Sequence, residues 1–245
     1  AVELAKEIGF TNINVDLIFA LPNQTLALWK DNLQKAVILS PQHISAYNLI
    51  IERGTPLADM VKNNNVSPLS TDEEADLYEF TMEYLEGEGY EHYEVSNYAK
   101  PGFKSKHNAN YWNRSNYLGF GPSSHSFWST TPSGTNRRWW NVRSIKKYCE
   151  DISAGRLPIA GEEILNLEQS IDEFVMLGLR SSGVDLLQLK NALGVNLLND
   201  TDGTIKQLID HNLAVVDKQV LRLTQKGFLL CDEISKSFLS RQEAP

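Results

Sequence analysis

The chain has 245 residues, of which 42% are hydrophobic and 22% are charged. These proportions are close to those of folded globular proteins, and they exclude a disordered chain, a collagen and a coiled coil. No apolar run approaches the roughly 18–20 residues that a membrane-spanning helix needs, so we expect no transmembrane segment. The net charge is −8. An acidic chain is a poor partner for a phosphate backbone, so we expect no nucleic acid to bind.

The chain contains 2 cysteines, Cys149 and Cys231, which lie far apart in the sequence. Two cysteines are too few for a disulfide framework, and alone they cannot hold a metal cluster. This cysteine usage is typical of proteins in a reducing compartment, so the sequence favours a cytoplasmic location.

The chain opens with a segment of helical periodicity. Ala1, Leu4, Ala5 and Ile8 recur at helical spacing, and Gly9 ends the segment. No N-cap residue precedes this helix, so we expect its start to lie outside the sequence. The alternative is a processed N-terminus with a frayed helix.

The following residues predict alternating strands and helices. Residues 12–21 are typical of a buried parallel strand, because both faces are mostly apolar. An amphipathic helix is expected from Leu26 to Val37, and a second apolar strand from His43 to Ile51. A capping box at Thr71–Glu74 starts a further helix. This order indicates a parallel βαβ arrangement, either a small open sheet or a piece of a larger barrel.

The middle of the chain, residues 90–140, is rich in aromatic residues, Gly, Asn, Ser and His. Extended pieces are expected at Glu91–Tyr98, Tyr117–Phe127 and Arg137–Asn141. Long irregular segments within a compact protein are usually functional or mobile. We therefore expect an antiparallel extension of the α/β part and place the first domain at residues 1–156.

The second domain is expected at residues 157–245, where the pattern turns helical from about Leu157. Helices are expected around 171–179, 186–192 and 205–211, followed by a hairpin at 214–223 and a final helix capped by Thr224. This order resembles a winged-helix module, a class that often binds DNA. Residues 162–243 carry 13 acidic and 8 basic side chains, which favours packing against protein instead.

Asp16 is the one charged residue of the first expected strand. It is either a structural carboxylate at a strand edge or a ligand-facing acid near the C-terminal end of a parallel strand, where α/β folds bind ligands. The residues alone leave both interpretations open.

The run from His92 to Trp112 is dense in polar aromatic residues. Within it, His107 is a candidate ligand for a metal or for heme iron, because neutral imidazole is a common ligand. Tyr111 and Trp112 could stack on a flat apolar molecule. The alternative is an exposed loop in which the histidine caps a backbone group.

Two further motifs carry weaker signals. Gly119–Ser126 is glycine-rich but is not followed by a helix, as a phosphate cradle would be. It indicates either a tight turn or a close approach of the backbone to a ligand. Arg137–Trp140 could contact a nucleic acid, but in an acidic chain a packed strand with paired arginines is the better interpretation.

Several motifs together resemble a known family. Asp16–Thr25 is similar to the DLIxGLPxQT strand of oxygen-independent coproporphyrinogen III oxidase-like proteins, which are radical S-adenosylmethionine (SAM) proteins, with Ala20 in place of the glycine. Tyr117–Ser126 and Leu223–Leu230 resemble later motifs in the same order. His107–Trp112 reads HNANYW and resembles the HNxxYW motif of the heme-chaperone (HemW-type) branch, which the decarboxylating oxidases lack.

The resemblance implies an α/β fold with a partial (β/α) radical-SAM barrel, then the antiparallel extension and the winged-helix-like domain. It implies that the chain is the C-terminal two-thirds of such a protein. The family's CxxxCxxC motif, which binds a [4Fe-4S] cluster, does not occur here. The intact protein would therefore bind SAM and the cluster, whereas this chain is expected to bind no cluster and to be catalytically inactive.

By resemblance, Asp16 takes the position of the family's SAM-contacting aspartate. Ile50 and His125 fall where the oxidases contact SAM, although His125 replaces an apolar residue, which weakens that assignment.

The resemblance also makes His107 the candidate ligand of heme iron, with Tyr111 and Trp112 shaping the heme pocket. Lys104 and Lys106 could meet the heme propionates.

Two functions follow from the resemblance. The first is a heme chaperone that binds heme and transfers it to recipient apo-hemoproteins. The alternative is the oxidase itself, an oxidoreductase of porphyrin biosynthesis that decarboxylates coproporphyrinogen III using SAM. A winged-helix regulator is a third, less favoured class. Exposed strand edges would also allow self-association.

Overall fold

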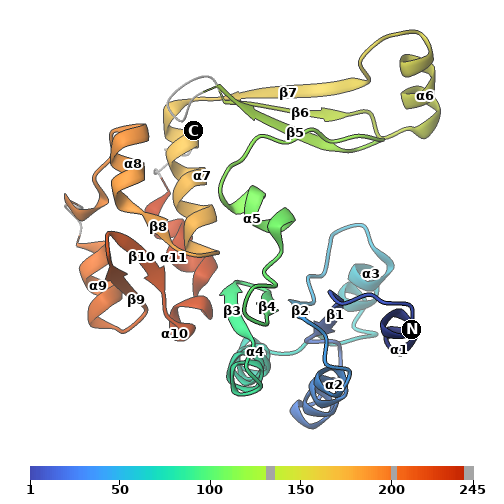
Figure 1. Ribbon diagram of the computed structural model, residues 1–245, viewed down its shortest axis with the longest axis vertical. Helices are drawn as coiled ribbons and strands as arrows, with labels where there is room; N and C mark the ends of the chain where they lie inside the picture. Colours follow the sequence, from blue (N-terminus) through green and yellow to red (C-terminus); the bar gives the residue numbers. More distant parts are fainter. Residues whose placement is uncertain (131–135, 200–202, 240–245) are drawn as a thin grey trace. The chain divides into compact units, whose positions relative to one another are not determined.

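The computed structural model describes residues 1–130, 136–199 and 203–239 (Figure 1). The chain divides into two compact units, Ala1–Ser105 and Lys106–Pro245. The boundary expected at residues 156 and 157 falls inside the second unit, directly before a strand that pairs with an earlier one.

The first unit contains a four-stranded sheet. Its elements are α1 (Val2–Glu7), β1 (Asn14–Phe19), α2 (Leu26–Ile38), β2 (His43–Asn48), α3 (Pro56–Lys62), α4 (Thr71–Gly87), β3 (Glu91–Glu94) and β4 (Asn97–Ala99). The strand order is β1-β2-β4-β3. Strands β1 and β2 are parallel, whereas β4 is antiparallel to both of its neighbours. The predicted βαβ unit is therefore confirmed.

Side-chain caps begin the helices of this unit. Thr25 accepts a hydrogen bond from the backbone N–H of Leu28 at the start of α2. At α4 the capping box consists of Ser70 and Glu73, one residue earlier than the expected Thr71–Glu74. The expected position was wrong because Ser70, in extended conformation, holds the N-cap place and Thr71 is already helical.

The core of the first unit lies between the sheet and helices α2 and α4. Trp29 and Leu33 of α2 are almost fully buried, and the Trp29 ring lies 5.5 Å from the Phe19 ring of β1. The opposite face of β1 is exposed at Asn14, Asp16 and Ile18. The expectation of a strand buried on both faces was therefore wrong, since only one face of this edge strand is covered.

The second unit begins with α5 (Lys106–Trp112) and an antiparallel sheet. The sheet contains β5 (His125–Ser129), β6 (Asn136–Asn141) and β7 (Ile159–Leu165), and α6 (Ile145–Ser153) connects β6 to β7 at the end of the sheet remote from α7 (Figure 1). Three of these elements were missed. α5 lies in a run expected to be irregular, α6 was not expected, and β7 forms where a helical pattern was expected.

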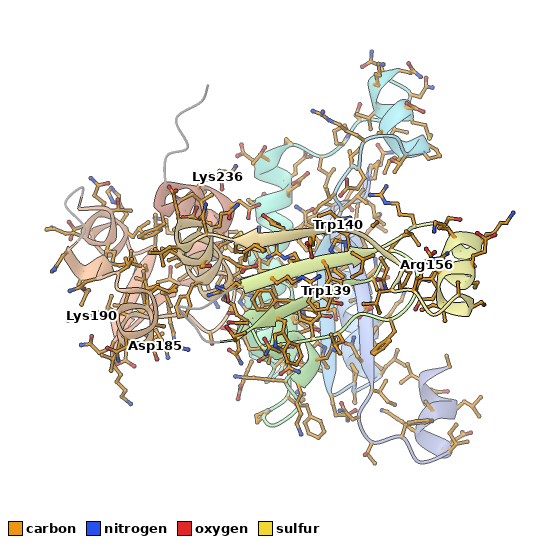
Figure 2. The ribbon with its side chains drawn as sticks, turned by 90° about the horizontal axis from the view of Figure 1, so that it is seen from above. Trp139, Trp140, Arg156, Asp185, Lys190 and Lys236 are labelled. Atoms are coloured by element: carbon orange, nitrogen blue, oxygen red, sulfur yellow. The ribbon has the colours of Figure 1, made fainter. Side chains whose placement is uncertain are left out.

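The paired arginines expected in β6 are confirmed. Arg137 contacts Glu162 at 2.5 Å, and Arg138 forms ion pairs with Glu163 and Glu173. The side chains of consecutive residues point to opposite faces of a strand, so the two arginines meet different partners. Trp139 and Trp140 follow them on the same strand (Figure 2).

The end of the second unit has the order of a winged-helix module. Its elements are α7 (Leu167–Leu179), β8 (Val184–Asp185), α8 (Leu186–Leu193), η1 (Leu197–Asn199), α9 (Thr204–Asp210), β9 (Ala214–Asp217), β10 (Val220–Leu223), α10 (Gln225–Phe228) and α11 (Cys231–Phe238). The sheet order is β8-β10-β9. Leu179, Leu189 and Leu221 are fully buried at its centre. The expected hairpin is confirmed, whereas the single final helix is in fact two helices.

The junction before α10 is tightly packed. Thr224 caps α10 through the N–H of Gly227 at 3.0 Å, as expected. A Cβ atom at Gly227 would lie 1.9 Å from the carbonyl oxygen of Leu213, so only glycine fits. In the part of the chain that the structure describes, no helix has both the length and the apolar character needed to span a membrane.

Candidate functional site

Asp16 lies on the exposed face of β1, as the third of its six residues, and pairs in register with Ser45 of β2. The amide of Asn14, two residues before it on the same face, donates to Asp16 Oδ1 at 2.6 Å and to Ser45 Oγ at 3.1 Å. Asn14 therefore ties the carboxylate of Asp16 to the neighbouring parallel strand.

This polar row continues into the sheet through His43. Its Nδ1 lies 2.7 Å from Asn14 Oδ1, and its Nε2 lies 2.7 Å from the hydroxyl of Tyr93, which also accepts from the backbone N–H of Ser105 at 3.2 Å. Burial lowers the pKa of His43, and the nearby carboxylate of Asp16 opposes this only in part. The histidine is thus held neutral between two partners that fix its orientation.

Asn14, His43 and Tyr93 were not predicted from the sequence as members of this row. One signal was available, because strand alternation places Asn14 and Asp16 on one face, and His43 begins the next expected strand. Tyr93 offered no comparable signal. It is 50 residues from His43, and only the antiparallel return of β3 and β4 brings the two together.

Helix α5 brings His107 and Tyr111 together. The two residues are four apart and share one face of the helix, with ring centroids 5.0 Å apart in an edge-to-face arrangement. Tyr111 in turn lies 4.7 Å from the ring of Tyr117, which stacks 6.3 Å from Phe127 of β5. His107 and Tyr111 are both exposed. The result is an accessible imidazole at the end of an aromatic row.

Trp112 does not share this face. It follows Tyr111 by one residue, and one residue turns an α-helix by about 100°. Trp112 instead lines a cavity of about 320 Å³ with Arg114 and residues around the end of α7. Arg114 is mostly buried and lies 3.4 Å from Glu173 of α7.

Two of the remaining expected site residues, Lys104 and His125, have partners of their own. Lys104 lies 2.8 Å from Glu91, so any contact with a propionate would compete with this ion pair. The ring of His125 lies 5.9 Å from that of Trp140, its cross-strand partner. Ile50 is exposed. His125 belongs to the second unit, whereas Asp16 and Ile50 belong to the first.

The glycine-rich motif from Gly119 to Ser126 forms a closed turn. The N–H of Gly119 donates to Ser126 Oγ at 3.0 Å, and a Cβ at Gly119 would lie 2.2 Å from the carbonyl oxygen of His125. The glycine thus allows backbone to approach backbone, which favours the tight-turn interpretation. Ala20, which replaces a motif glycine, has a φ of 60°, in the left-handed region that glycine favours.

The residues can be compared with the groups that the resemblance implies. The exposed imidazole of His107 would suit a ligand of heme iron, and the exposed carboxylate of Asp16 would suit an acceptor for a hydroxyl or ammonium group of SAM. A [4Fe-4S] cluster does not fit, because the described residues form no group of three or more potential metal ligands. Cys149 is exposed on α6, and Cys231 is buried on α11.

Comparison with known proteins identifies similar chains. A family model described as the HemN C-terminal domain matches residues 165–230. A protein of Lactococcus lactis named heme chaperone HemW is 34% identical over 98% of this chain and 61% of its own length. A protein of Bacillus subtilis with the same name is 34% identical over 97% of this chain and 61% of its own length. This chain thus spans about three-fifths of the relatives' length.

One solved structure is similar over almost the whole chain. It is that of coproporphyrinogen III oxidase (HemN) from Escherichia coli, described as a radical SAM enzyme, with a TM-score of 0.73 over 98% of this chain and 57% of that chain. At 21% sequence identity this likeness shows the fold alone. Together with the observed topology, it confirms the expected α/β fold class.

Proposed function

We propose that the protein containing this chain is a heme chaperone, which binds heme and transfers it to apo-hemoproteins. The chain itself belongs to the HemW-type family of radical SAM proteins. The observation that carries this proposal is the exposed imidazole of His107 on α5, with the ring of Tyr111 beside it. The relatives that bear the name heme chaperone cover almost all of this chain.

In this proposal His107 would ligate the heme iron, and Tyr111 would offer flat apolar surface to the porphyrin. Trp112 lies on another side of α5, where it lines the cavity beside Arg114. In this proposal it packs the helix against the rest of the second unit. Lys106, exposed at the start of α5, is the cation available to a propionate.

The test is a heme titration of the full chain and of His107→Ala, followed by the Soret band. We expect the variant to bind heme more than about tenfold more weakly, which corresponds to about 1.4 kcal/mol. The thermal midpoint should barely move, because His107 is exposed. His211→Ala is the matched control, since His211 is also an exposed histidine of the second unit. Unchanged heme affinity in a folded His107→Ala protein would remove the assignment.

We further propose that SAM and the [4Fe-4S] cluster belong to the whole protein, in a cytoplasmic setting. This chain would contribute Asp16 as a SAM-facing acceptor and His125 as a weaker contact, but no cluster ligand. Decarboxylation of coproporphyrinogen III stays the alternative function, and an assay of the whole protein for protoporphyrinogen formation distinguishes it from heme transfer.

A further inference from the structure

The polar row of the first unit forms one continuous chain of hydrogen bonds. It runs from the backbone N–H of Ser105 to the hydroxyl of Tyr93, at 3.2 Å, and on to the ring of His43, at 2.7 Å. From the ring it passes to the amide of Asn14, at 2.7 Å, and ends on the carboxylate of Asp16, at 2.6 Å. The chain therefore connects a buried histidine to an exposed acid.

The carboxylate of Asp16 sets the direction of these hydrogen bonds. An ionised carboxylate can only accept, so the group of Asn14 that faces Asp16 must be the –NH₂. The same –NH₂ donates to Ser45 Oγ at 3.1 Å, which agrees with this orientation. The amide oxygen of Asn14 then faces His43 Nδ1, so this nitrogen must carry the proton. The opposite orientation would place the amide oxygen against the carboxylate, where two acceptors repel.

The other side of the histidine ring agrees with this direction. Burial lowers the pKa of His43, so the ring is neutral and Nε2 is an acceptor once Nδ1 carries the proton. The hydroxyl of Tyr93 donates to Nε2, and its oxygen accepts from Ser105. Burial also raises the pKa of Tyr93, so the hydroxyl keeps the proton that it donates. Each donor thus meets an acceptor, and the ring has one defined tautomer.

We propose that His43 is a positioning residue, which acts through Asn14 to hold the carboxylate of Asp16 in one orientation. Because Asn14 binds Oδ1, the second oxygen, Oδ2, has a defined direction in which to accept from a ligand. An acceptor that is oriented before binding loses less conformational freedom when the ligand arrives. The role of Asp16 as an acceptor for SAM rests on the proposed function, whereas the orientation of its carboxylate does not.

The first test reads the tautomer of His43 from the ¹⁵N resonances of its ring, in the full chain at neutral pH. We expect a protonated Nδ1 and an unprotonated Nε2. Asp16→Asn should allow the Nε2–H tautomer to appear, because an amide at this position can offer Asn14 either a donor or an acceptor. Asp76→Asn, at an exposed acid on α4 of the same unit, is the matched control and should change nothing. A protonated Nε2 in the wild type, or an unchanged tautomer in Asp16→Asn, would overturn the inference.

The second test asks whether His43 positions Asp16. Three-bond couplings from Asp16 Cγ to its own backbone N and C′ report the χ1 rotamer, and we expect a single rotamer in the wild type. His43→Leu should give averaged couplings, because Asn14 loses the donor that orients it. His43→Asn, whose amide nitrogen can take the place of Nδ1, should restore the single rotamer. If His43 served only to stabilise the sheet, a folded His43→Leu protein would keep one Asp16 rotamer, and that result would contradict the proposal.

The consequence for a ligand is tested by titrating the whole protein with SAM. His43→Leu should weaken SAM binding by about fivefold, which corresponds to about 1 kcal/mol, the usual net contribution of one hydrogen bond. Asp76→Asn should bind as the wild type does. Wild-type affinity in a folded His43→Leu protein would contradict the positioning role. Wild-type affinity in Asp16→Ala would instead remove the proposed SAM contact, and the two tests without ligand would still decide what orients the carboxylate.

Discussion

His92 makes the stability of the first unit depend on pH. Its ring stacks on Tyr98 at 4.5 Å and meets the edge of Tyr78 at 6.3 Å. Burial lowers the pKa of His92 from 6.5 to about 4, and hydrogen bonds to the backbone of Val95 and Glu94 oppose this only in part. The folded protein therefore keeps His92 neutral at a pH at which the unfolded chain protonates it.

The sign of the effect follows from proton binding. Between pH 6.5 and about 4 the unfolded chain binds more protons than the folded one, so acid favours unfolding. The stabilisation is complete above about pH 7 and is lost as the pH falls through this window. At about 1.4 kcal/mol per pH unit, the full difference is about 3 kcal/mol, of which about 2 kcal/mol is lost by pH 5.

The assay is urea unfolding of the wild type and of His92→Gln at pH 7.5 and pH 5, followed by ¹⁹F NMR of 5-fluorotryptophan. Trp29 is the one tryptophan of the first unit, so its resonance reports that unit alone. We expect the wild type to lose about 2 kcal/mol more than the variant between the two pH values. His43, whose pKa burial also lowers, is present in both proteins, so its effect cancels. Equal losses would refute the reasoning.

Two further substitutions test the packing of each unit. Thr81→Val should destabilise the first unit by about 1–3 kcal/mol in the same urea assay, because Thr81 Oγ1 accepts from the buried Trp29 Nε1 at 2.8 Å. Thr81→Ser keeps the hydroxyl and should destabilise the unit less. A greater loss of stability in Thr81→Ser than in Thr81→Val would contradict this role. Gly227→Ala should lower the thermal midpoint of the second unit by at least the equivalent of about 2 kcal/mol, because its Cβ would meet the Leu213 carbonyl. Gly87→Ala, where a Cβ meets nothing within 4 Å, is a control in the first unit and should leave the midpoint of that unit unchanged. An unchanged midpoint of the second unit in Gly227→Ala would show that the clash is relieved.

The spacing of apolar residues along the chain was sufficient to predict those helices and strands that bury one apolar face. The parallel pair β1 and β2, helix α2, and the helices and hairpin of the winged-helix-like module lie close to their expected places. Their signals are periodicity and caps, which depend on residues within one or two turns. Strand β7 was missed because its formation depends on a distant part of the chain. Its pairing with β6 joins residues as far apart in the sequence as Asn136 and Leu165, and pairing across such a distance leaves no local signal.

The residues of the candidate sites were likewise predicted only where the signal is local in the sequence. Asp16 and His107 stand out as chemically distinctive in the sequence alone, whereas the unexpected helix α5 is what places Tyr111 beside His107. The position of His43 between Asn14 and Tyr93 follows from the packing of distant segments and could not be seen in the sequence. The tertiary structure also decides that Trp112 faces the Arg114 cavity and not the His107 face. The physical reason is that hydrogen bonds and burial between distant segments are set by how the sheets and helices pack, which the spacing of residues along one element does not encode.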